Sequence, residues 1–424
     1  MAFTPAKSNP LAPVKSLGGP TLLPLSISMT PGTITSPSLS MSKLSADPNS
    51  KPLRILHLLG CEEDIGGVLT VVRELAAASV VQGAIHSGLV HTSFVERRPS
   101  SLQWCRSPHL RMESPRVAAL LWRGFRAALE LGRHQKNFSP TVIHAHSRGP
   151  LATVLFARLL FKTPPIVFTN HAFARTPAFY RWAAARPRFT TVVLSHSMAT
   201  HYGLIPLPSN VEIIPACCSD ALFERSLQPS ISFPHRIRLV GVGNLIRWKK
   251  WNLVLDALAR LPISLRQRFH FTLWGPTPTD ADSQSFAGEL KTMIGQLGLA
   301  PYVRLAGPTL DVPSAIEASE LFVLPSTNEP CSVALAEALA LGRPAVVSSS
   351  GGNVDIVQHG RTGRLFKPDD PADLARQLAG YAEGDWTTAG PEECRESIRH
   401  HAASAVWNRY NKLYRRLLAG PPSL

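Results

Sequence analysis

Two glutamates, Glu329 and Glu337, offer the clearest chemistry in the chain. Glu329 follows the apolar run LFVLPS, which is typical of a buried strand, and Glu337 lies eight residues later in a predicted helix that starts around Ser332. Carboxylates placed in this way can face one cleft and accept hydrogen bonds from sugar or ribose hydroxyls, while the turn between them leaves backbone N–H groups for phosphate oxygens. The same spacing also fits two ordinary helix acids, so both interpretations stay open.

A basic loop follows a second predicted strand. Residues 243–258, GNLIRWKKWNLVLDAL, place Asn244, Arg247 and Lys249 between the run IRLVGVGN and a helix. Cations at such a loop can neutralise a diphosphate as it departs, which stabilises the transition state of a transfer reaction. The alternative is a solvated basic loop without a ligand.

Glycines and histidines end several strands in the first half of the chain. Gly66 and Gly67 precede a helix, where glycine lets the backbone approach a phosphate closely. His171 ends the run PPIVFTNH and could bind a hydroxyl or carry a proton, although a strand-end histidine is often structural. His144 and His146 end the preceding strand. No Cys or Asp accompanies them at zinc-like spacing, so no metal site is predicted.

Apolar runs alternate with helical patterns in two successive sets, which predicts buried parallel strands in two α/β units. At 424 residues the chain exceeds what one core organises, so two facing doubly wound, Rossmann-like domains with a ligand cleft between them are expected. The expected divisions are a disordered Pro/Ser-rich extension over 1–50, a first domain over 51–228, a second over 229–400, and a C-terminal helix over 401–424 that crosses back to the first.

The chain is strongly basic. It holds 44 Lys and Arg against 29 Asp and Glu, and 17 of these basic residues against five acidic ones lie between residues 65 and 219. The excess favours an anionic partner. The segment LLWRGFRAALELGRHQKNF has the composition of an interfacial helix on anionic lipid. A soluble basic face, with Leu120, Leu121 and Leu129 in the core, is the alternative. Few, scattered cysteines and no membrane-spanning segment favour a cytoplasmic chain.

Residues 321–368 resemble glycosyltransferase family 4, the retaining nucleotide-sugar transferases of the GT-B fold. The two glutamates match the family's E-x7-E element. Further matching positions are Ala338, Gly342, Pro344, Gly351, Gly352, Asp355, Ile356, Val357 and Gly363. The resemblance covers nearly all of residues 52–418 and is looser in the first half.

The resemblance implies roles for individual residues. Glu329 would contact donor-sugar hydroxyls, Glu337 the ribose, and Lys249 the diphosphate, with His171 facing the donor sugar. The other positions implied for donor binding are Gly67, Asn244, Arg247, Cys331, Ser332 and Val333. Two departures stand out. The loop reads Glu-Pro-Cys-Ser where many members have Glu-Gly-Phe-Gly, and Asn244 replaces the family arginine, for which Arg247 is a candidate substitute.

The family implies transfer of a sugar from a nucleotide diphosphate donor to a glycan or lipid-linked acceptor, with retention of configuration and no metal or cofactor. Cell-surface polysaccharide or glycolipid synthesis is the expected setting, in the cytoplasm, with peripheral contact at the inner face of an anionic membrane as a further expectation. The alternatives are another enzyme on this scaffold, such as an epimerase or sucrose-type synthase, a catalytically weakened transferase, and a basic binding protein. Nucleic acid is not an expected partner, because no nucleic-acid-binding motif is present.

Overall fold

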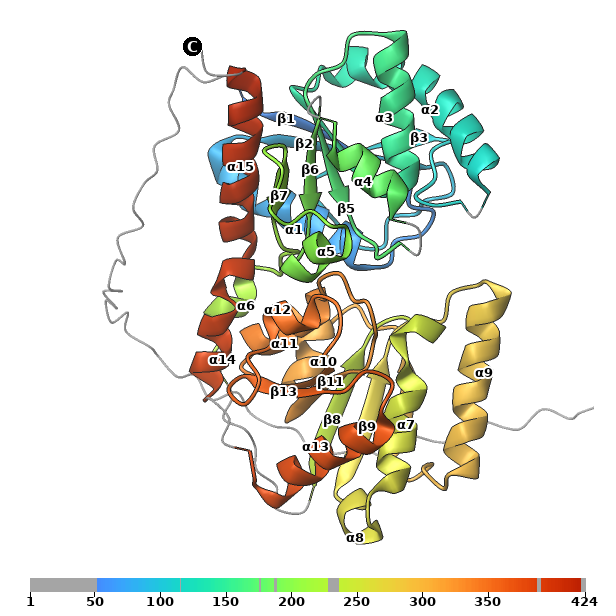
Figure 1. The fold of residues 1–424 in the computed structure, drawn as a ribbon, viewed down its shortest axis with the longest axis vertical. Coiled ribbons are helices and arrows are strands. Elements are labelled where there is room, and N and C mark those ends of the chain that lie inside the picture. Colours follow the sequence, from blue (N-terminus) through green and yellow to red (C-terminus); the bar gives the residue numbers. More distant parts are fainter. Residues whose placement is uncertain are drawn as a thin grey trace, which may run out of the picture. The chain divides into compact units, whose positions relative to one another are not determined.

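The chain is built around two parallel β-sheets in a computed structural model (Figure 1). The structure describes residues 52–114, 116–174, 177–186, 189–227, 236–386 and 390–420. The predicted extension over 1–50 and most of the predicted joint between the two α/β units lie outside these ranges. The predicted domain boundaries stay predictions.

The first sheet has seven strands in the order β3-β2-β1-β4-β5-β6-β7, all parallel. Its central strands are apolar and almost fully buried, as expected of strands covered on both faces. The strands are β1 (Arg54–Leu58), β2 (Ile85–His91), β3 (Gln103–Ser107), β4 (Val142–His146), β5 (Ile166–Asn170), β6 (Thr190–Val193) and β7 (Val211–Ile213).

The second sheet has six parallel strands in the order β10-β9-β8-β11-β12-β13. Every residue of β11 and β12 is buried. The strands are β8 (Ile237–Val242), β9 (Phe269–Trp274), β10 (Val303–Gly307), β11 (Leu321–Leu324), β12 (Ala345–Ser348) and β13 (Gly363–Phe366).

Helices follow most of the strands and cover both faces of each sheet. In each sheet the strand order reverses once, and right-handed crossovers therefore put the helices of the two halves on opposite faces. The α-helices of the first half are α1 (Gly67–Ser79), α2 (Val117–Phe138), α3 (Arg148–Leu160), α4 (Ala178–Ala184), α5 (His196–His201) and α6 (Ala221–Glu224). Those of the second half are α7 (Trp251–Arg260), α8 (Ile263–Arg266), α9 (Ala281–Gln296), α10 (Val312–Glu317), α11 (Val333–Ala340), α12 (Asn353–Ile356), α13 (Pro371–Glu383), α14 (Pro391–Ser397) and α15 (Ala403–Ala419). The 3₁₀ segments are η1 (Val80–Gln82), η2 (Arg247–Lys249) and η3 (Arg399–His401).

The C-terminal helix α15 packs on the first sheet's unit, beside α1 (Figure 1). Val406, Tyr410 and Leu413 form its buried stripe, as the amphipathic sequence pattern predicts. Gln82 ties it to η1, because its side-chain oxygen accepts hydrogen bonds from the Trp407 indole and the Asn411 amide. The last helix of the chain therefore helps to cover the first sheet.

The strand order also indicates where a ligand binds. Each sheet reverses direction between two neighbouring strands, β1 and β4 in the first and β8 and β11 in the second. In open α/β sheets the ligand crevice lies beyond the carboxyl ends of such strands. The loops that leave these ends carry Gly67, Lys249 and Glu329, so the topology brings sequence-predicted residues to the expected edges.

Candidate active site

A buried ion pair joins the two loops at the carboxyl ends of β8 and β11. The Nζ atom of Lys249 lies 2.6 Å from Oε2 of Glu329, and the side chains are 12% and 8% exposed. The hydroxyl of Ser326 donates a second hydrogen bond, of 3.0 Å, to the same oxygen. Glu329 is therefore not an ordinary exposed helix acid. Its carboxylate is fixed, and the Lys249 ammonium is held where β8 and β11 meet.

Two glycines allow the chain to approach the backbone of Glu329. The N–H of Gly352 donates to the Glu329 carbonyl at 2.6 Å. A Cβ on Gly351, whose φ is +60°, would lie 2.5 Å from that carbonyl oxygen, and a Cβ on Gly352 would overlap the carbonyl of Pro330. Only glycine fits this contact, which gives a physical reason for the Gly-Gly step in the sequence.

The loop that carries Lys249 rests on a buried tryptophan. Trp251 is fully buried, its indole N–H donates to the carbonyl of Asn244 at 3.0 Å, and its ring lies against Gly241. Gly243 lies directly beneath Lys249, since a Cβ there would be 3.5 Å from Cε of the lysine. Lys250 adopts the left-handed conformation that starts α7 and pairs outward with Asp369. The direction of Lys249 therefore follows from local packing.

The N-termini of α1 and α11 meet beside the loop that carries Glu329. A Cβ on Gly67, the first residue of α1, would lie 3.4 Å from Cγ2 of Val333, the first residue of α11. Ser332 caps α11 by accepting a hydrogen bond from the N–H of Leu335. Among the described residues, the N–H groups of Cys331, Ser332 and Val333 have no recorded partner. Free N–H groups and two positive helix ends favour an anion here.

Glu337 lies further along α11, facing α1. Burial, and next the carboxylate of Glu74, raise the pKa of Glu337 from 4.5 to about 8. Burial likewise raises the pKa of Glu74, whereas a hydrogen bond with the Ser219 side chain lowers it by a smaller amount. Arg98 favours the ionised form of both acids. Burial and a like charge both favour the protonated form of a carboxyl group, so Glu337 is largely uncharged at neutral pH in the free protein.

Asn244 and Arg247 do not join the ion pair. The guanidinium of Arg247 is bound to Glu289 at 2.6 and 2.8 Å and to Asp282 at 2.6 Å, and it lies over the ring of Phe286. These three partners belong to α9 and hold Arg247 on the surface. No hydrogen bond of the Asn244 amide is recorded within the described part of the chain. Their roles in donor binding stay predictions.

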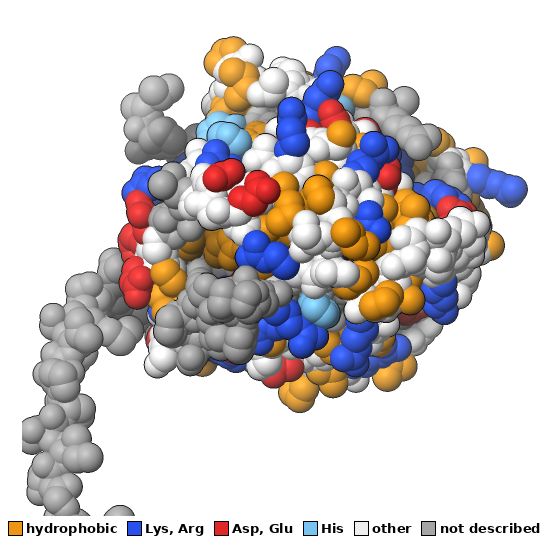
Figure 2. Space-filling model, turned by 90° about the horizontal axis from the view of Figure 1, so that it is seen from below, with side chains coloured by type: hydrophobic (Ala, Val, Ile, Leu, Met, Phe, Trp, Pro, Cys, Tyr) orange, Lys and Arg blue, Asp and Glu red, His pale blue; other side chains and the backbone are white. Residues whose placement is uncertain are grey.

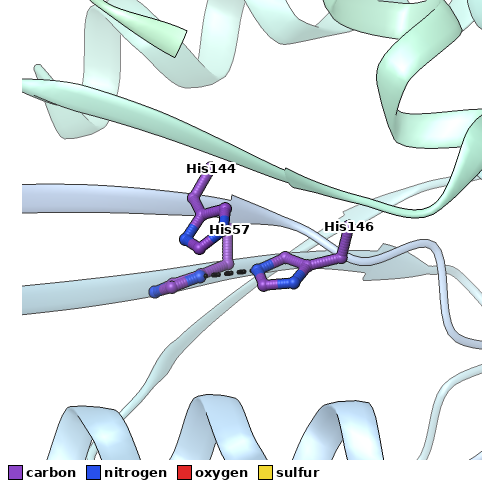
Figure 3. Close-up of side chains that lie close together, drawn as sticks. All are labelled: His57, His144 and His146. Atoms are coloured by element: carbon purple, nitrogen blue, oxygen red, sulfur yellow. Dashed lines mark hydrogen bonds between the residues drawn. The ribbon is translucent and has the colours of Figure 1, made fainter. Parts of the chain in front are cut away.

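His171 is connected to a row of buried histidines. Its Nε2 lies 2.9 Å from Nδ1 of His146, and Nε2 of His146 lies 3.0 Å from Nδ1 of His57. Figure 3 shows the contact between His57 and His146, with His144 stacked beside it. Burial lowers the pKa of His171 to about 4. At neutral pH His171 is therefore an uncharged hydrogen-bonding group.

Three of these histidines are close enough to be considered as metal ligands. Ring nitrogens of His57, His144 and His146 all lie within 4.8 Å of one another (Figure 3). Each of their six ring nitrogens already has a hydrogen-bond partner; those of His144 are Tyr414 and Thr169, both at 2.7 Å. No carboxylate belongs to the group. A metal would have to break these hydrogen bonds, so the arrangement fits a hydrogen-bonded network better.

A separate cavity of about 460 Å³ lies on another side of the 329–333 loop. Its lining includes Cys331, Gly352, Asp355, His196 and Arg409, but neither Lys249, Glu329 nor Glu337. Burial raises the pKa of Cys331 to about 12, so the thiol is protonated. The cavity and the ion pair thus both involve the 329–333 loop, but Cys331 lines the cavity whereas Glu329 forms the ion pair.

Several residues of the site were not predicted from the sequence. Glu74 and Arg98 act on Glu337 from segments far away in the chain. Ser326 and Gly243 act within the loops that carry Glu329 and Lys249, where neither residue type signals its contact. His57 and His86 sit inside strands, where a single polar residue in an apolar run gives no sign of its partner. The strand register, which places His57 beside His144, is the signal that could have found them.

Two family descriptions match the chain in succession. Glycosyltransferase Family 4 matches residues 65–219, and Glycosyl transferases group 1 matches residues 236–383. The chain belongs to glycosyltransferase family 4. Together the matches include every predicted site residue of this family 4 chain, from Gly67 to Glu337.

Curated relatives of this family 4 chain are distant. A protein of Escherichia coli described as a colanic acid biosynthesis glycosyltransferase, WcaL, is 26% identical over 183 residues, 41% of this chain and 43% of WcaL. Sulfoquinovosyl transferase SQD2 of Arabidopsis thaliana is 26% identical over 270 residues, 57% of this chain and 49% of SQD2. The chain therefore spans less than half the length of these relatives.

Solved structures support the fold. Anabaena HepE in complex with UDP has a TM-score of 0.67 at 18% identity, covering 86% of this chain and 100% of that one. HepE has also been solved in complex with UDP-glucose. The expected architecture of two Rossmann-like units in the GT-B arrangement is confirmed.

Proposed function

We propose that the chain transfers a sugar from a nucleotide diphosphate sugar to an acceptor hydroxyl with retention of configuration. The observation that carries this proposal is the buried pair of Lys249 and Glu329, beside the free N–H groups at the start of α11. A structural salt bridge needs no anion site next to it. Here a cation, a carboxylate and helix N-termini lie together, which is the set of groups that a sugar diphosphate requires.

In the proposed reaction Lys249 binds the diphosphate. The ammonium is held by Glu329 before the donor arrives, so little reorganisation is needed when charge builds on the leaving phosphate. The N–H groups of residues 331–333 add hydrogen bonds to the same oxygens. Glu329 keeps one carboxylate oxygen for Lys249 and Ser326 and has the other for a donor-sugar hydroxyl.

Retention follows from a displacement on one face of the sugar. The bond from the anomeric carbon to the phosphate oxygen breaks while the acceptor oxygen bonds to the same face. The acceptor proton passes to the leaving phosphate oxygen, so the diphosphate serves as its own base. His171 is uncharged at neutral pH, so it would accept a hydrogen bond from a hydroxyl of the donor sugar or donate one to it. Protein cations and helix ends neutralise the phosphate, so no step calls for a metal.

The ribose is assigned to Glu337. A carboxylate binds a diol well because its two oxygens accept from two hydroxyls. Burial, and next the neighbouring Glu74, raise the pKa of Glu337 to about 8, so that it is largely protonated in the free protein at neutral pH. Ribose binding would favour the ionised form, and a proton would then leave the site. This assignment rests on the E-x7-E resemblance together with the partly buried position of Glu337 and its raised pKa.

The acceptor is proposed to be a glycan or a lipid-linked sugar in polysaccharide or glycolipid synthesis. The names of the two distant relatives, WcaL and SQD2, favour this setting. The charge distribution agrees with it. Residues 220–424 hold 22 Lys and Arg against 20 Asp and Glu, and Figure 2 shows side chains of both signs on one face, whereas the excess positive charge lies before residue 220.

The α2 surface is the proposed membrane contact. We define it by the exposed side chains of Leu121, Trp122, Leu129, Arg126, Arg133 and Lys136. Leu121 and Leu129 are 46% and 48% exposed, so these two do not lie in the core as the alternative expected, whereas Leu120 is partly buried. A soluble basic face remains the alternative. Arg126 lies over the Trp122 ring at 5.9 Å. No helix among the described residues is long and apolar enough to cross a bilayer. Action at the inner face of a membrane stays a prediction.

Sedimentation with lipid vesicles tests this contact. Binding to vesicles that contain phosphatidylglycerol, absent with pure phosphatidylcholine and lost in Trp122→Ser/Leu129→Ser, is the expected result. The matched control is Trp182→Ser/Ile263→Ser, which removes exposed apolar side chains elsewhere. Equal loss in both double variants would remove the α2 surface from the proposal.

A thermal-shift screen tests the transferase proposal. The purified protein is melted with UDP, GDP, ADP, CMP and their common sugar conjugates, because a ligand that binds the native state raises the melting temperature. We expect one nucleoside diphosphate and its sugar conjugates to stabilise the wild type but not Glu337→Ala. If none of them does while anionic vesicles or short RNA do, the chain is a basic binding protein on this fold.

A catalytically weakened transferase is the second candidate. Asn244 supplies hydrogen bonds but no charge, and Arg247 is held by Asp282 and Glu289, away from Lys249. Asn244→Arg would add a cation to the loop that also carries Lys249. A large gain in turnover would support this second candidate, whereas unchanged turnover would mean that Lys249 and the backbone suffice.

A further inference from the structure

Three buried histidines and the partly buried His171 form a row across the first sheet. They are His86 in β2, His57 in β1, His146 at the end of β4, and His171 just after β5. The strands are neighbours in the order β2-β1-β4-β5, so the row runs across four consecutive strands. At its far end lies Ser79, the last residue of α1. The row thus connects Ser79, in the interior of the first unit, to His171, the residue predicted to face the donor sugar.

Consecutive rings touch through their nitrogens. Nε2 of His86 lies 3.1 Å from the Ser79 hydroxyl, and its Nδ1 lies 2.9 Å from Nε2 of His57. His57 then contacts His146 at 3.0 Å, the dashed line in Figure 3, and His146 contacts His171 at 2.9 Å. These distances are those of good hydrogen bonds. Only Nδ1 of His171 has no partner recorded among the described residues.

Ser79 sets the direction of every hydrogen bond in the row. Its Oγ lies 2.7 Å from the carbonyl oxygen of Ala76, which can only accept. The single hydroxyl proton is therefore given to Ala76, and the Ser79 oxygen must accept from Nε2–H of His86. A neutral imidazole has one N–H and one lone pair. His86 must then accept at Nδ1 from Nε2–H of His57, and the pattern repeats.

Burial keeps these rings uncharged. It lowers the pKa of His86 to about 3 and the pKa of His57 and His146 well below 6.5, with neighbouring histidines adding to the effect on the last two. No acidic side chain is recorded in contact with the four rings within the described ranges. The row therefore holds one proton per ring and cannot change direction by gaining a proton at neutral pH.

We propose that this row fixes His171 as the Nε2–H tautomer, so that its bare Nδ1 is offered as a hydrogen-bond acceptor to the sugar substrate. Ser79, His86, His57 and His146 are positioning residues in this proposal. The inference deepens the proposed function, and its use by a sugar rests on that function. The tautomer itself does not, because it follows from the hydrogen bonds of the free protein.

Nitrogen-15 NMR of the full chain, labelled at histidine, reads the tautomer directly. Bare and protonated ring nitrogens differ widely in chemical shift, and His171 is assigned by the signals missing from His171→Gln. We expect Nε2–H and bare Nδ1 for His171, and the same for the other three rings. Protonated Nδ1 in His171 would overturn the proposal. One equivalent of bound metal by elemental analysis, with metal-shifted signals of His57 and His146, would overturn it too.

A matched pair of variants tests the connection. His57 and His144 are partners in the register of β1 and β4 and are equally buried, but only His57 is a link in the row. His57→Leu should leave His171 as a mixture of tautomers, whereas His144→Leu should leave it a single tautomer. His57→Gln, which keeps a donor and an acceptor, should restore part of the single form. An unchanged His171 in His57→Leu would contradict the proposal.

Kinetics separate this inference from the proposed function. If the chain is a transferase, His57→Leu should lower kcat by about tenfold or more, the scale expected when a partner that orients a functional histidine is lost. The KM for the donor should change little, because the nucleotide contacts remain. Should the wild type show the expected tautomer but no transfer with any donor, the row stands and the proposed function fails. If folding of a variant fails, the wild-type spectrum still decides.

Discussion

The Nζ atom of Lys249 and the Oε2 atom of Glu329 lie 2.6 Å apart, although 80 residues separate them in the chain. Each comes from a loop at the carboxyl end of a strand, β8 or β11, and these strands are hydrogen-bonded to each other where the sheet reverses. The reversal of the strand order at β8 and β11 therefore brings the two loops together. There Glu329 holds the Lys249 ammonium in a fixed position near the N-terminus of α11.

Removing this charge should impair transfer far more than removing its neighbour. Lys249→Met should lower kcat by about 10²–10³-fold, the effect of losing one electrostatic contact to a transition state. Lys250→Met makes the same substitution one residue on, at a side chain that pairs outward with Asp369. Its kcat should stay within about twofold. Steady-state kinetics with the selected donor measure both, and similar losses in the two variants would rule out a special role for Lys249.

The same substitution should reduce stability, because it leaves Glu329 buried without its cation. Breaking one side of a buried pair costs more than removing both partners. Denaturant unfolding should therefore show Lys249→Met as less stable than Lys249→Met/Glu329→Gln, by about 1–3 kcal/mol of coupling. The double variant should remain inactive. Strict additivity of the two substitutions would mean that the pair contributes little.

Glu337 should make stability depend on pH. Its pKa is raised from 4.5 to about 8 in the folded protein, so the folded state binds the proton more tightly than the unfolded chain does. Stability from this group is full below about pH 4.5 and falls as pH rises toward about 8. Thermal melts between pH 6 and 9 should show a smaller decrease for Glu337→Gln than for the wild type. The exposed Glu63→Gln is the control and should follow the wild type.

The glycine contact at Glu329 should be intolerant of any side chain. Gly352→Ala would place a Cβ against the carbonyl of Pro330 and push the loop away from β12. We expect a lower melting temperature and loss of stabilisation by the nucleoside diphosphate. Gly288→Ala, in α9 with open space around the new Cβ, should leave binding intact and the melting temperature unchanged or slightly higher. A Gly352→Ala protein that binds as well as Gly288→Ala would contradict this account of the loop.

Much of the architecture could be predicted from local patterns. Apolar runs such as LFVL and AVVS have no polar alternation and became fully buried parallel strands. The helix predicted to start around Ser332 is α11, with Ser332 as its N-cap. The E-x7-E spacing and the Gly-Gly step could be matched to a family because they are close in sequence. These features depend on neighbours within about ten residues.

The remaining features depend on contacts that no local pattern contains. Arg247 seemed a candidate substitute cation because it stands near Lys249 in sequence, but the acids of α9 hold it on the surface. The raised pKa of Glu337 comes from burial and from Glu74, more than 250 residues away. The histidine row requires the register of four strands. Such contacts follow from how the elements pack, which single residues do not reveal.

Isothermal titration of the wild type and Lys249→Met with a nucleoside diphosphate, chosen by the thermal screen, tests the central claim most directly. The corresponding monophosphate and nucleoside are titrated alongside. Our account predicts that the diphosphate binds most tightly and that Lys249→Met weakens it at least tenfold, about 1.4 kcal/mol, while nucleoside binding is unchanged. If all three ligands bind alike, or if the variant binds the diphosphate as well as the wild type does, then Lys249 does not hold a diphosphate and the proposed site is wrong.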